Sequence, residues 1–149
     1  MKMIVYATDG SENAVKALDL ACDLATAKNA QLAVVHVQRR QGSATIPPEM
    51  MEYERLENMR ATEGELMRTA AEQILADAAM KAERNGVGNV ETHHLIGDPT
   101  HQIVEFAHQS GADAIVMGSR GLGDLQGLFM GSVSHKVAHA APCTCIVVR

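Results

Sequence analysis

The sequence of 149 residues contains little cysteine, no long apolar run and no excess of positive charge. Its three cysteines, Cys22, Cys143 and Cys145, are an odd number without the spacing of a zinc site, which predicts reduced thiols. No stretch approaches the roughly 18 apolar residues of a membrane span, and the amino-terminal residues lack the apolar core of a signal peptide. We therefore expect a cytoplasmic protein that has no membrane partner.

Basic side chains are outnumbered by acidic ones. Lys and Arg together number 13 against 18 Asp and Glu, so the net charge is −5 and offers no general attraction to nucleic acid. Any phosphate site must then be local and built from backbone amides. The hydrophobic fraction of 46% is ample for one core, and the length is typical of one domain, which we expect over 1–149.

Short apolar runs alternate with helical repeats along the chain. Runs typical of strands that are covered on both faces lie at 3–8, 32–37, 90–96, 114–117 and 144–148. Helical spacing or helix-forming composition follows these runs at about 11–25, 66–84, 99–110 and 131–140. Five strands that alternate with four helices predict an α/β fold, with an open parallel sheet and helices on both faces.

The stretch between the second and third strands is the least regular. Residues 39–48 have the composition of a loop. Strong helix formers dominate from Glu49 to Arg84, but Gly64 lies inside this stretch and costs roughly 1 kcal/mol relative to alanine. We therefore expect a helix over 66–84, with 49–63 forming either a separate helical turn or a mobile flap.

Glycines cluster directly after the fourth predicted strand and directly before the last predicted helix. The five are Gly118, Gly121, Gly123, Gly127 and Gly131. Glycine lets backbone N–H groups approach a ligand, and a helix that begins at Gly131 adds unpaired N–H groups and the positive end of its dipole. With the hydroxyls of Ser132 and Ser134, this segment predicts a cradle for phosphates at the carboxyl edge of the sheet. The alternative is a surface loop with flexible glycines.

Two familiar nucleotide motifs do not fit this cluster. A P-loop needs a Gly-Lys pair, which the sequence lacks. Gly121, Gly123 and Gly127 approach the dinucleotide-binding fingerprint, but the last spacing is one residue too long and the motif follows the fourth strand instead of the first.

A third pattern fits. Gly118-Ser-Arg-Gly121, a gap of nine residues and Gly131-Ser132 resemble the Gly-x2-Gly-x9-Gly-Ser/Thr motif of ATP-binding universal stress proteins. Four more segments look like that family: 4–11, Gly97-Asp98-Pro99, 112–118 and 141–148. The resemblance implies the sheet order 3-2-1-4-5 of an adenine nucleotide alpha hydrolase-like fold, usually dimeric, and a site for ATP with Mg²⁺.

The resemblance also implies a role for each residue of that site. Ala7, Thr8 and Asp9 flank adenine and ribose, Val37 packs on the adenine, Met117, Gly118, Arg120 and Gly121 line ribose and phosphates, and Gly131, Ser132, Val133 and Ser134 hold the phosphates. The residues themselves leave alternatives open. Asp9 can accept a hydrogen bond from a sugar hydroxyl or cap the following helix with Ser11, and Val37 and Met117 can be plain core.

No catalytic constellation emerges from the sequence. His135 and His139 share a helical face, but Lys136 stands where a metalloprotease has Glu, so we expect surface or interface histidines and no resident metal. The expected function is an ATP-loaded regulatory protein with slow or no hydrolysis. The alternatives are a slow ATPase and a nucleotide-free scaffold of the same fold that acts through protein contacts.

The last predicted strand suggests how two copies assemble. In the implied sheet order it is an edge, and 144–148 is apolar on both faces, without a proline or an inward charge to protect it. We therefore expect a homodimer that is joined through the carboxyl-terminal strand.

Overall fold

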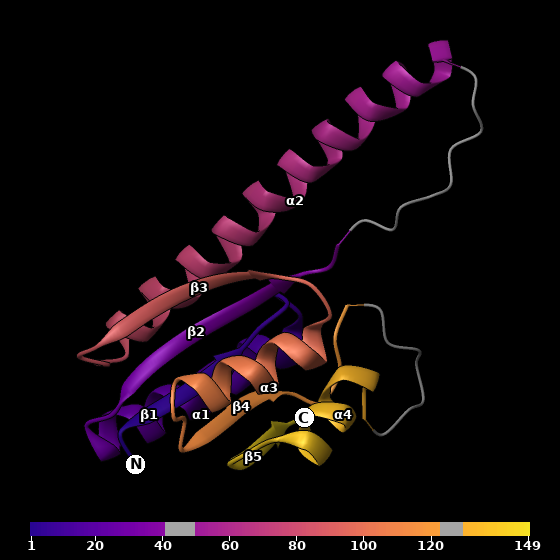
Figure 1. Cartoon of the computed structure of the whole chain (residues 1–149). Helices are drawn as coiled ribbons and strands as arrows, with labels where there is room; N and C mark the ends of the chain where they lie inside the picture. Colours follow the sequence, from indigo (N-terminus) through magenta and orange to yellow (C-terminus); the bar gives the residue numbers. More distant parts are fainter. Residues whose placement is uncertain (41–49, 123–129) are drawn as a thin grey trace.

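The computed structural model describes residues 1–40, 50–122 and 130–149, with the side chains of 50–57, 60 and 61 left out. A single sheet of five parallel strands forms the centre, in the order β3-β2-β1-β4-β5 (Figure 1). The strands are β1 (Met3–Ala7), β2 (Gln31–Gln38), β3 (Val90–Ile96), β4 (Ala114–Gly118) and β5 (Thr144–Val148). The helices are α1 (Glu12–Lys28), α2 (Met50–Arg84), α3 (Pro99–Gln109) and α4 (Ser132–Ala140). The predicted fold class and strand order are confirmed.

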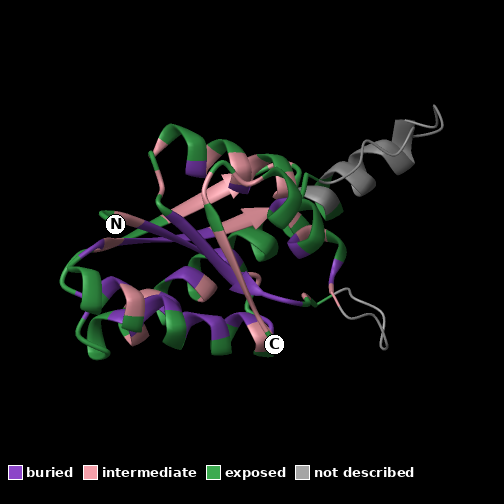
Figure 2. Ribbon diagram, turned by 90° about the horizontal axis from the view of Figure 1, so that it is seen from below, coloured by how far each residue is buried: buried purple, intermediate pink, exposed green. Residues whose placement is uncertain are grey.

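Helices cover both faces of the sheet, as the continuous apolar strands require. One core cluster joins Ile4 and Tyr6 of β1 to α1 and to the carboxyl-terminal half of α2. The other joins Val5 and Ala7 of the same strand to α3 and α4. Figure 2 shows the central strands buried between these two layers, with exposed residues along the outer sides of the helices. Successive residues of β1 therefore pack alternately into two separate cores.

The long helix α2 corrects one expectation. It runs unbroken from Met50 to Arg84, so the separate turn or flap predicted for 49–63 is wrong wherever the structure describes it. Gly64 is tolerated because a Cβ there would meet nothing within 4 Å, and the surrounding helix formers outweigh its cost of about 1 kcal/mol. The amino-terminal part of α2 projects beyond the sheet (Figure 1). Most of the loop predicted over 39–48 lies outside the described residues.

Two helix starts follow the sequence closely. The Ser11 hydroxyl accepts a hydrogen bond from the backbone N–H of Ala14 at 3.4 Å and caps α1. The Asp98 carboxylate accepts one from the backbone N–H of His101 at 2.9 Å and caps α3, with Pro99 in its first turn. Both caps lie at the carboxyl edge of the sheet, where they fix the direction in which each helix leaves.

Gly118, the last residue of β4, has a packing role that the sequence did not suggest. A Cβ at this position would lie 2.7 Å from the backbone nitrogen of Ala14 and 2.7 Å from the carbonyl carbon of Asn13. Both atoms belong to the backbone in the first turn of α1, which cannot move aside as a flexible side chain could. Glycine at 118 therefore allows α1 to pack directly against the end of β4.

We expect Gly118→Ala to lower the free energy of unfolding by about 1–3 kcal/mol, because the added methyl forces α1 away from β4. Urea denaturation followed by circular dichroism measures the change. Gly88→Ala is the matched control, since a Cβ at Gly88 meets nothing within 4 Å and should cause no loss of stability. Equal stability of the two variants would contradict the close packing at Gly118.

Candidate functional site

A cleft of about 630 Å³ opens at the carboxyl edge of the sheet, above the ends of β1, β2 and β4. All the residues of the predicted site except Gly131 line it: Ala7, Thr8, Asp9, Val37, Met117, Gly118, Arg120, Gly121, Ser132, Val133 and Ser134. Gly131 is the N-cap of α4, directly before three of these residues. The structure thus brings together four segments that are far apart in the sequence.

The turn after β1 is hydrogen-bonded to the segment after β4. One oxygen of the Asp9 carboxylate accepts from the backbone N–H of Ser11 and the other from the backbone N–H of Leu122, both at 2.9 Å. The Ser11 hydroxyl donates to the carbonyl of Arg120 at 3.3 Å. Asp9 therefore combines a contact to the start of α1, which the sequence offered as an alternative, with a contact to the glycine-rich segment that it did not suggest.

The two ends of the glycine-rich segment meet at Ser119. The carbonyl oxygen of this buried residue accepts from the backbone N–H of Gly131 at 2.6 Å and from the hydroxyl of Ser134 at 2.7 Å. The Ser134 hydroxyl also lies 3.0 Å from the carbonyl oxygen of Gly131. This hydroxyl is thus directed at backbone carbonyls, whereas the sequence offered it as a donor to phosphate. Ser119 was missed because its role depends on a contact between distant backbone atoms.

The start of α4 offers backbone N–H groups to the cleft. Gly131 has no side chain with which to cap the helix, so the N–H groups of the first turn depend on other partners. Ser132 is exposed and Val133 is half-buried, and both line the cleft. Arg120 is exposed at the rim, where its guanidinium adds positive charge to that of the helix dipole. This end of the cleft suits an anion.

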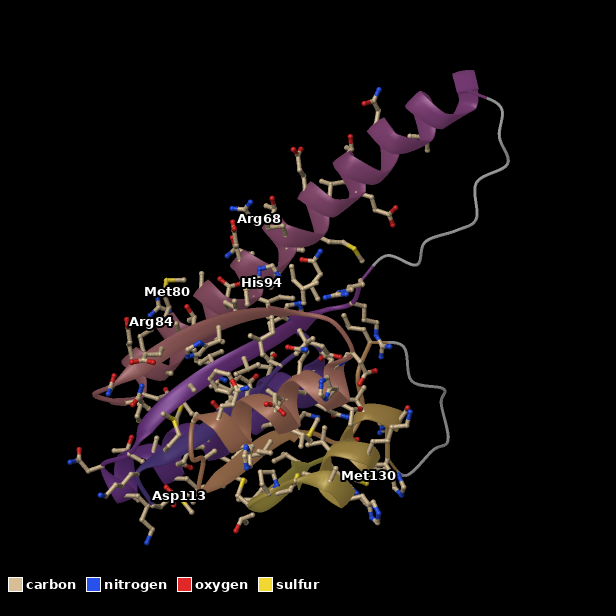
Figure 3. All side chains as sticks on the ribbon, viewed as in Figure 1. Arg68, Met80, Arg84, His94, Asp113 and Met130 are labelled. Atoms are coloured by element: carbon tan, nitrogen blue, oxygen red, sulfur yellow. The ribbon has the colours of Figure 1, made fainter. Side chains whose placement is uncertain are left out.

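The opposite end of the cleft carries polar side chains of β2 that the sequence analysis missed. The Nδ1 atom of His36 lies 2.8 Å from the carbonyl oxygen of Thr8, so Nδ1 carries the proton and donates. The Nε2 atom of His94 lies 2.9 Å from the side-chain oxygen of Gln38. His94, labelled in Figure 3, comes from β3, the strand beside β2. The parallel register of β2 and β3 brings the side chains of Gln38 and His94 together.

One face of α2 closes this end of the cleft. The wall consists of Met67, Ala70, Ala71 and Ile74, which repeat at helical spacing. This periodicity lies within the predicted helix over 66–84 and was the available signal for these residues. Pro99 and Ile103 of α3 complete the lining on the other side. The lining near β2 therefore combines the apolar side chains of α2 and α3 with the polar side chains of His36, Gln38 and Arg39, and it suits a flat group that has hydrogen-bonding edges.

Four titratable groups that do not line the cleft have raised pKa values. Burial raises the pKa of Tyr6 to about 12, and its hydroxyl donates to the carbonyl of Ala14 at 2.7 Å. Burial also raises the pKa of the Cys22, Cys143 and Cys145 thiols, which form no disulfide with one another. Thiols with a raised pKa are protonated near neutral pH and are poor nucleophiles.

The described residues contain no cluster of three or more His, Cys, Asp or Glu side chains that could hold a metal ion. Within the same part of the chain, no helix is both long and apolar enough to cross a membrane.

Comparison with known proteins agrees with this fold. The model of the universal stress protein family matches residues 1–149. The universal stress protein YxiE of Bacillus subtilis is 36% identical over 148 residues, which cover 99% of this chain and 98% of that protein. Universal stress protein UspA from Lactobacillus plantarum has a TM-score of 0.84 at 25% identity, over 99% of this chain and 97% of the other.

A universal stress protein solved in complex with cAMP has a TM-score of 0.73 at 25% identity, again over 99% of this chain and 97% of the other. The match of the family model over the whole chain, together with the close relative in Bacillus subtilis, shows that this chain belongs to the universal stress protein family.

Proposed function

We propose that this chain binds ATP in the cleft and works in the stress response as a nucleotide-loaded regulatory protein. The observation that carries the proposal is the meeting of Gly118–Gly121 with the start of α4 at the carboxyl edge of the sheet. Open parallel sheets bind ligands at this edge, and backbone N–H groups at a helix start favour phosphate. A relative of similar fold whose structure contains cAMP supports an adenine nucleotide as the ligand.

In this proposal the phosphates lie against Gly121 and the first turn of α4. A chain with a net charge of −5 has no basic field with which to attract a polyanion, so backbone amides must bind the phosphates locally. Fixed N–H dipoles act at short range and need no surplus of lysine or arginine. Arg120 at the rim adds a cation that can pair with a phosphate oxygen.

The base and sugar occupy the end of the cleft near β2. Val37 and Met117 offer apolar surface to the adenine, and the Thr8 backbone borders the ribose. Mg²⁺ enters with the nucleotide and is held chiefly by phosphate oxygens. The Asp9 carboxylate in the lining already accepts two backbone N–H groups and is poorly placed to bind a cation by itself.

We also propose a homodimer through β5. This strand ends the sheet order, and its residues Cys145–Val148 are only half-buried. The Val148 carbonyl accepts from the backbone N–H of Ser119 on the β4 side. Because alternate residues of a strand direct their backbone groups to opposite sides, Val147 presents its N–H to the free edge. The same strand of a second copy, antiparallel across a two-fold axis, would cover this edge.

We expect Gly131→Asp to abolish ATP binding while the fold survives. The new carboxylate would repel the phosphates, yet φ at Gly131 is −71° and Asp is a good N-cap, so the backbone of α4 accepts the change. Isothermal titration calorimetry with ATP and Mg²⁺ measures the affinity. Gly88→Asp, the same substitution before β3 at the opposite edge of the sheet, should bind as the wild type does. Equal affinity of both variants would refute the site.

We expect ATP hydrolysis to be slow or absent, well below the roughly 10 per second of a median enzyme. The sequence lacks the P-loop lysine, and both oxygens of the Asp9 carboxylate accept backbone N–H groups. Steady-state phosphate release with Mg²⁺ measures the rate. Turnover at enzyme-like rates that is lost in Asp9→Ala would show that the chain is an ATPase.

We expect Val147→Pro to convert the dimer into a monomer, because proline removes the N–H that faces the free edge of β5. Analytical ultracentrifugation should give a mass of about 32 kDa for the wild type, twice the 16.0 kDa of one chain, and the mass of one chain for the variant. Circular dichroism checks that the variant is folded. A wild type that sediments as a monomer at micromolar concentration would rule out the dimer.

A further inference from the structure

The Asp9 carboxylate joins two segments that are 113 residues apart in the sequence. Its Oδ1 atom accepts from the backbone N–H of Ser11, and its Oδ2 atom accepts from the backbone N–H of Leu122. Hydrogen bonds to an ionised acceptor are about twice as strong as those between neutral groups. Because Leu122 is 76% exposed, burial of its side chain adds little to holding this part of the chain in place.

Ser11 provides a second link between the same segments, through its hydroxyl and the carbonyl of Arg120 at 3.3 Å. Residues 120–122 of the glycine-rich segment are therefore aligned along the turn that starts α1. Gly121 lies between the two linked residues, Arg120 and Leu122. The Gly121 backbone N–H belongs to the same planar peptide group as the Arg120 carbonyl, which Ser11 holds, and the hydrogen bond at Leu122 fixes the peptide group that follows it.

We propose that Asp9 is a positioning residue, which binds the Leu122 N–H and thereby fixes the backbone of 120–122 in the conformation that faces the phosphates. This inference rests on the proposed binding of ATP. It differs from the role that the sequence suggested, in which Asp9 accepts a hydrogen bond from a sugar hydroxyl. The contact with Leu122 joins two groups of the protein itself and uses no atom of a nucleotide, so in this proposal the carboxylate organises the site.

When a substitution removes the charge of Asp9, the direction in which ATP affinity changes shows whether Asp9 positions the segment. A carboxylate near a phosphate site repels the ligand, so removing its charge should strengthen ATP binding if Asp9 did nothing else. Loss of positioning has the opposite effect, because the amides then lose their orientation. If Asp9 contacts the sugar, its loss should lower the affinity for a nucleoside and for a nucleotide alike. If Asp9 is a positioning residue, its loss should lower the affinity only for ligands that carry phosphates.

Asp9→Asn tests these alternatives with little change in shape. The two N–H groups bind different oxygens of the Asp9 carboxylate, and Asn replaces one of these oxygens with an NH2 group that cannot accept. The Asx-turn geometry favours the amide oxygen on the side of the Ser11 N–H, so the Leu122 N–H faces a donor. The link to Leu122 is then lost. We expect ATP affinity to fall by about tenfold or more and the affinity for adenosine to stay unchanged, both measured by calorimetry.

Asp98→Asn is the matched control for the change in charge. Asp98 also lies at the carboxyl edge of the sheet and caps α3, and its carboxylate makes no hydrogen bond to the described residues 118–122 or 130–131. This variant should bind ATP at least as tightly as the wild type. The proposal would be overturned if the Asp9→Asn protein bound ATP as tightly as the wild type. It would also be overturned if the affinity for adenosine fell to the same extent as the affinity for ATP.

A second measurement needs no ligand. Hydrogen exchange of the Leu122 amide, followed by NMR, should be about tenfold faster in Asp9→Asn than in the wild type, with an unchanged melting temperature. If the wild type binds no adenine ligand, the proposed function fails, and this exchange rate still decides whether Asp9 positions the segment. Equal exchange in the two proteins would refute the role of Asp9.

Discussion

The first turn of α1 lies so close to the end of β4 that a Cβ at residue 118 would be 2.7 Å from the backbone nitrogen of Ala14. This close approach determines much of the site. It brings the turn after β1 within hydrogen-bonding distance of the segment after β4, so that Asp9 reaches Leu122 and Ser11 reaches Arg120. A larger residue at 118 would separate the two segments and break both links.

The parallel sheet explains why these segments meet at all. Because β1, β2 and β4 run in the same direction, the segments that follow them all emerge at one edge. The helices then pack on both faces of the sheet, and the cleft lies between them at that edge. The Ser119 carbonyl fixes the other side of the glycine-rich segment through Gly131 and Ser134, so both ends of that segment are held by hydrogen bonds. The cleft is thus a consequence of strand direction together with a few backbone contacts.

The sequence predicts the elements of this fold better than the contacts of its site. Strand runs and caps such as Ser11 and Asp98 are local signals, and the strand order followed from a resemblance of motifs. The extent of α2 was underestimated because Gly64 was given more weight than its neighbours. The contacts of Asp9, Ser119 and Ser134 could not be predicted, since each joins a side chain or carbonyl to a backbone atom whose position depends on the tertiary fold. The contact of Gln38 in β2 with His94 depends in the same way on the register between β2 and β3.

A phosphate site built from backbone amides differs physically from one built from basic side chains. Lysine and arginine side chains can follow a ligand as it moves, but an amide dipole points where the backbone holds it. In the proposed site, affinity then depends on the conformation of the backbone near Gly121 and at the start of α4. A change that rotates these peptides by a small angle alters binding without altering charge. Linkage is reciprocal, so a nucleotide that binds these amides also stabilises the backbone conformation that presents them. If the chain acts as the proposed regulatory protein, nucleotide binding would stabilise the conformation of the segment that follows β4, through the same hydrogen bonds that connect that segment to α1.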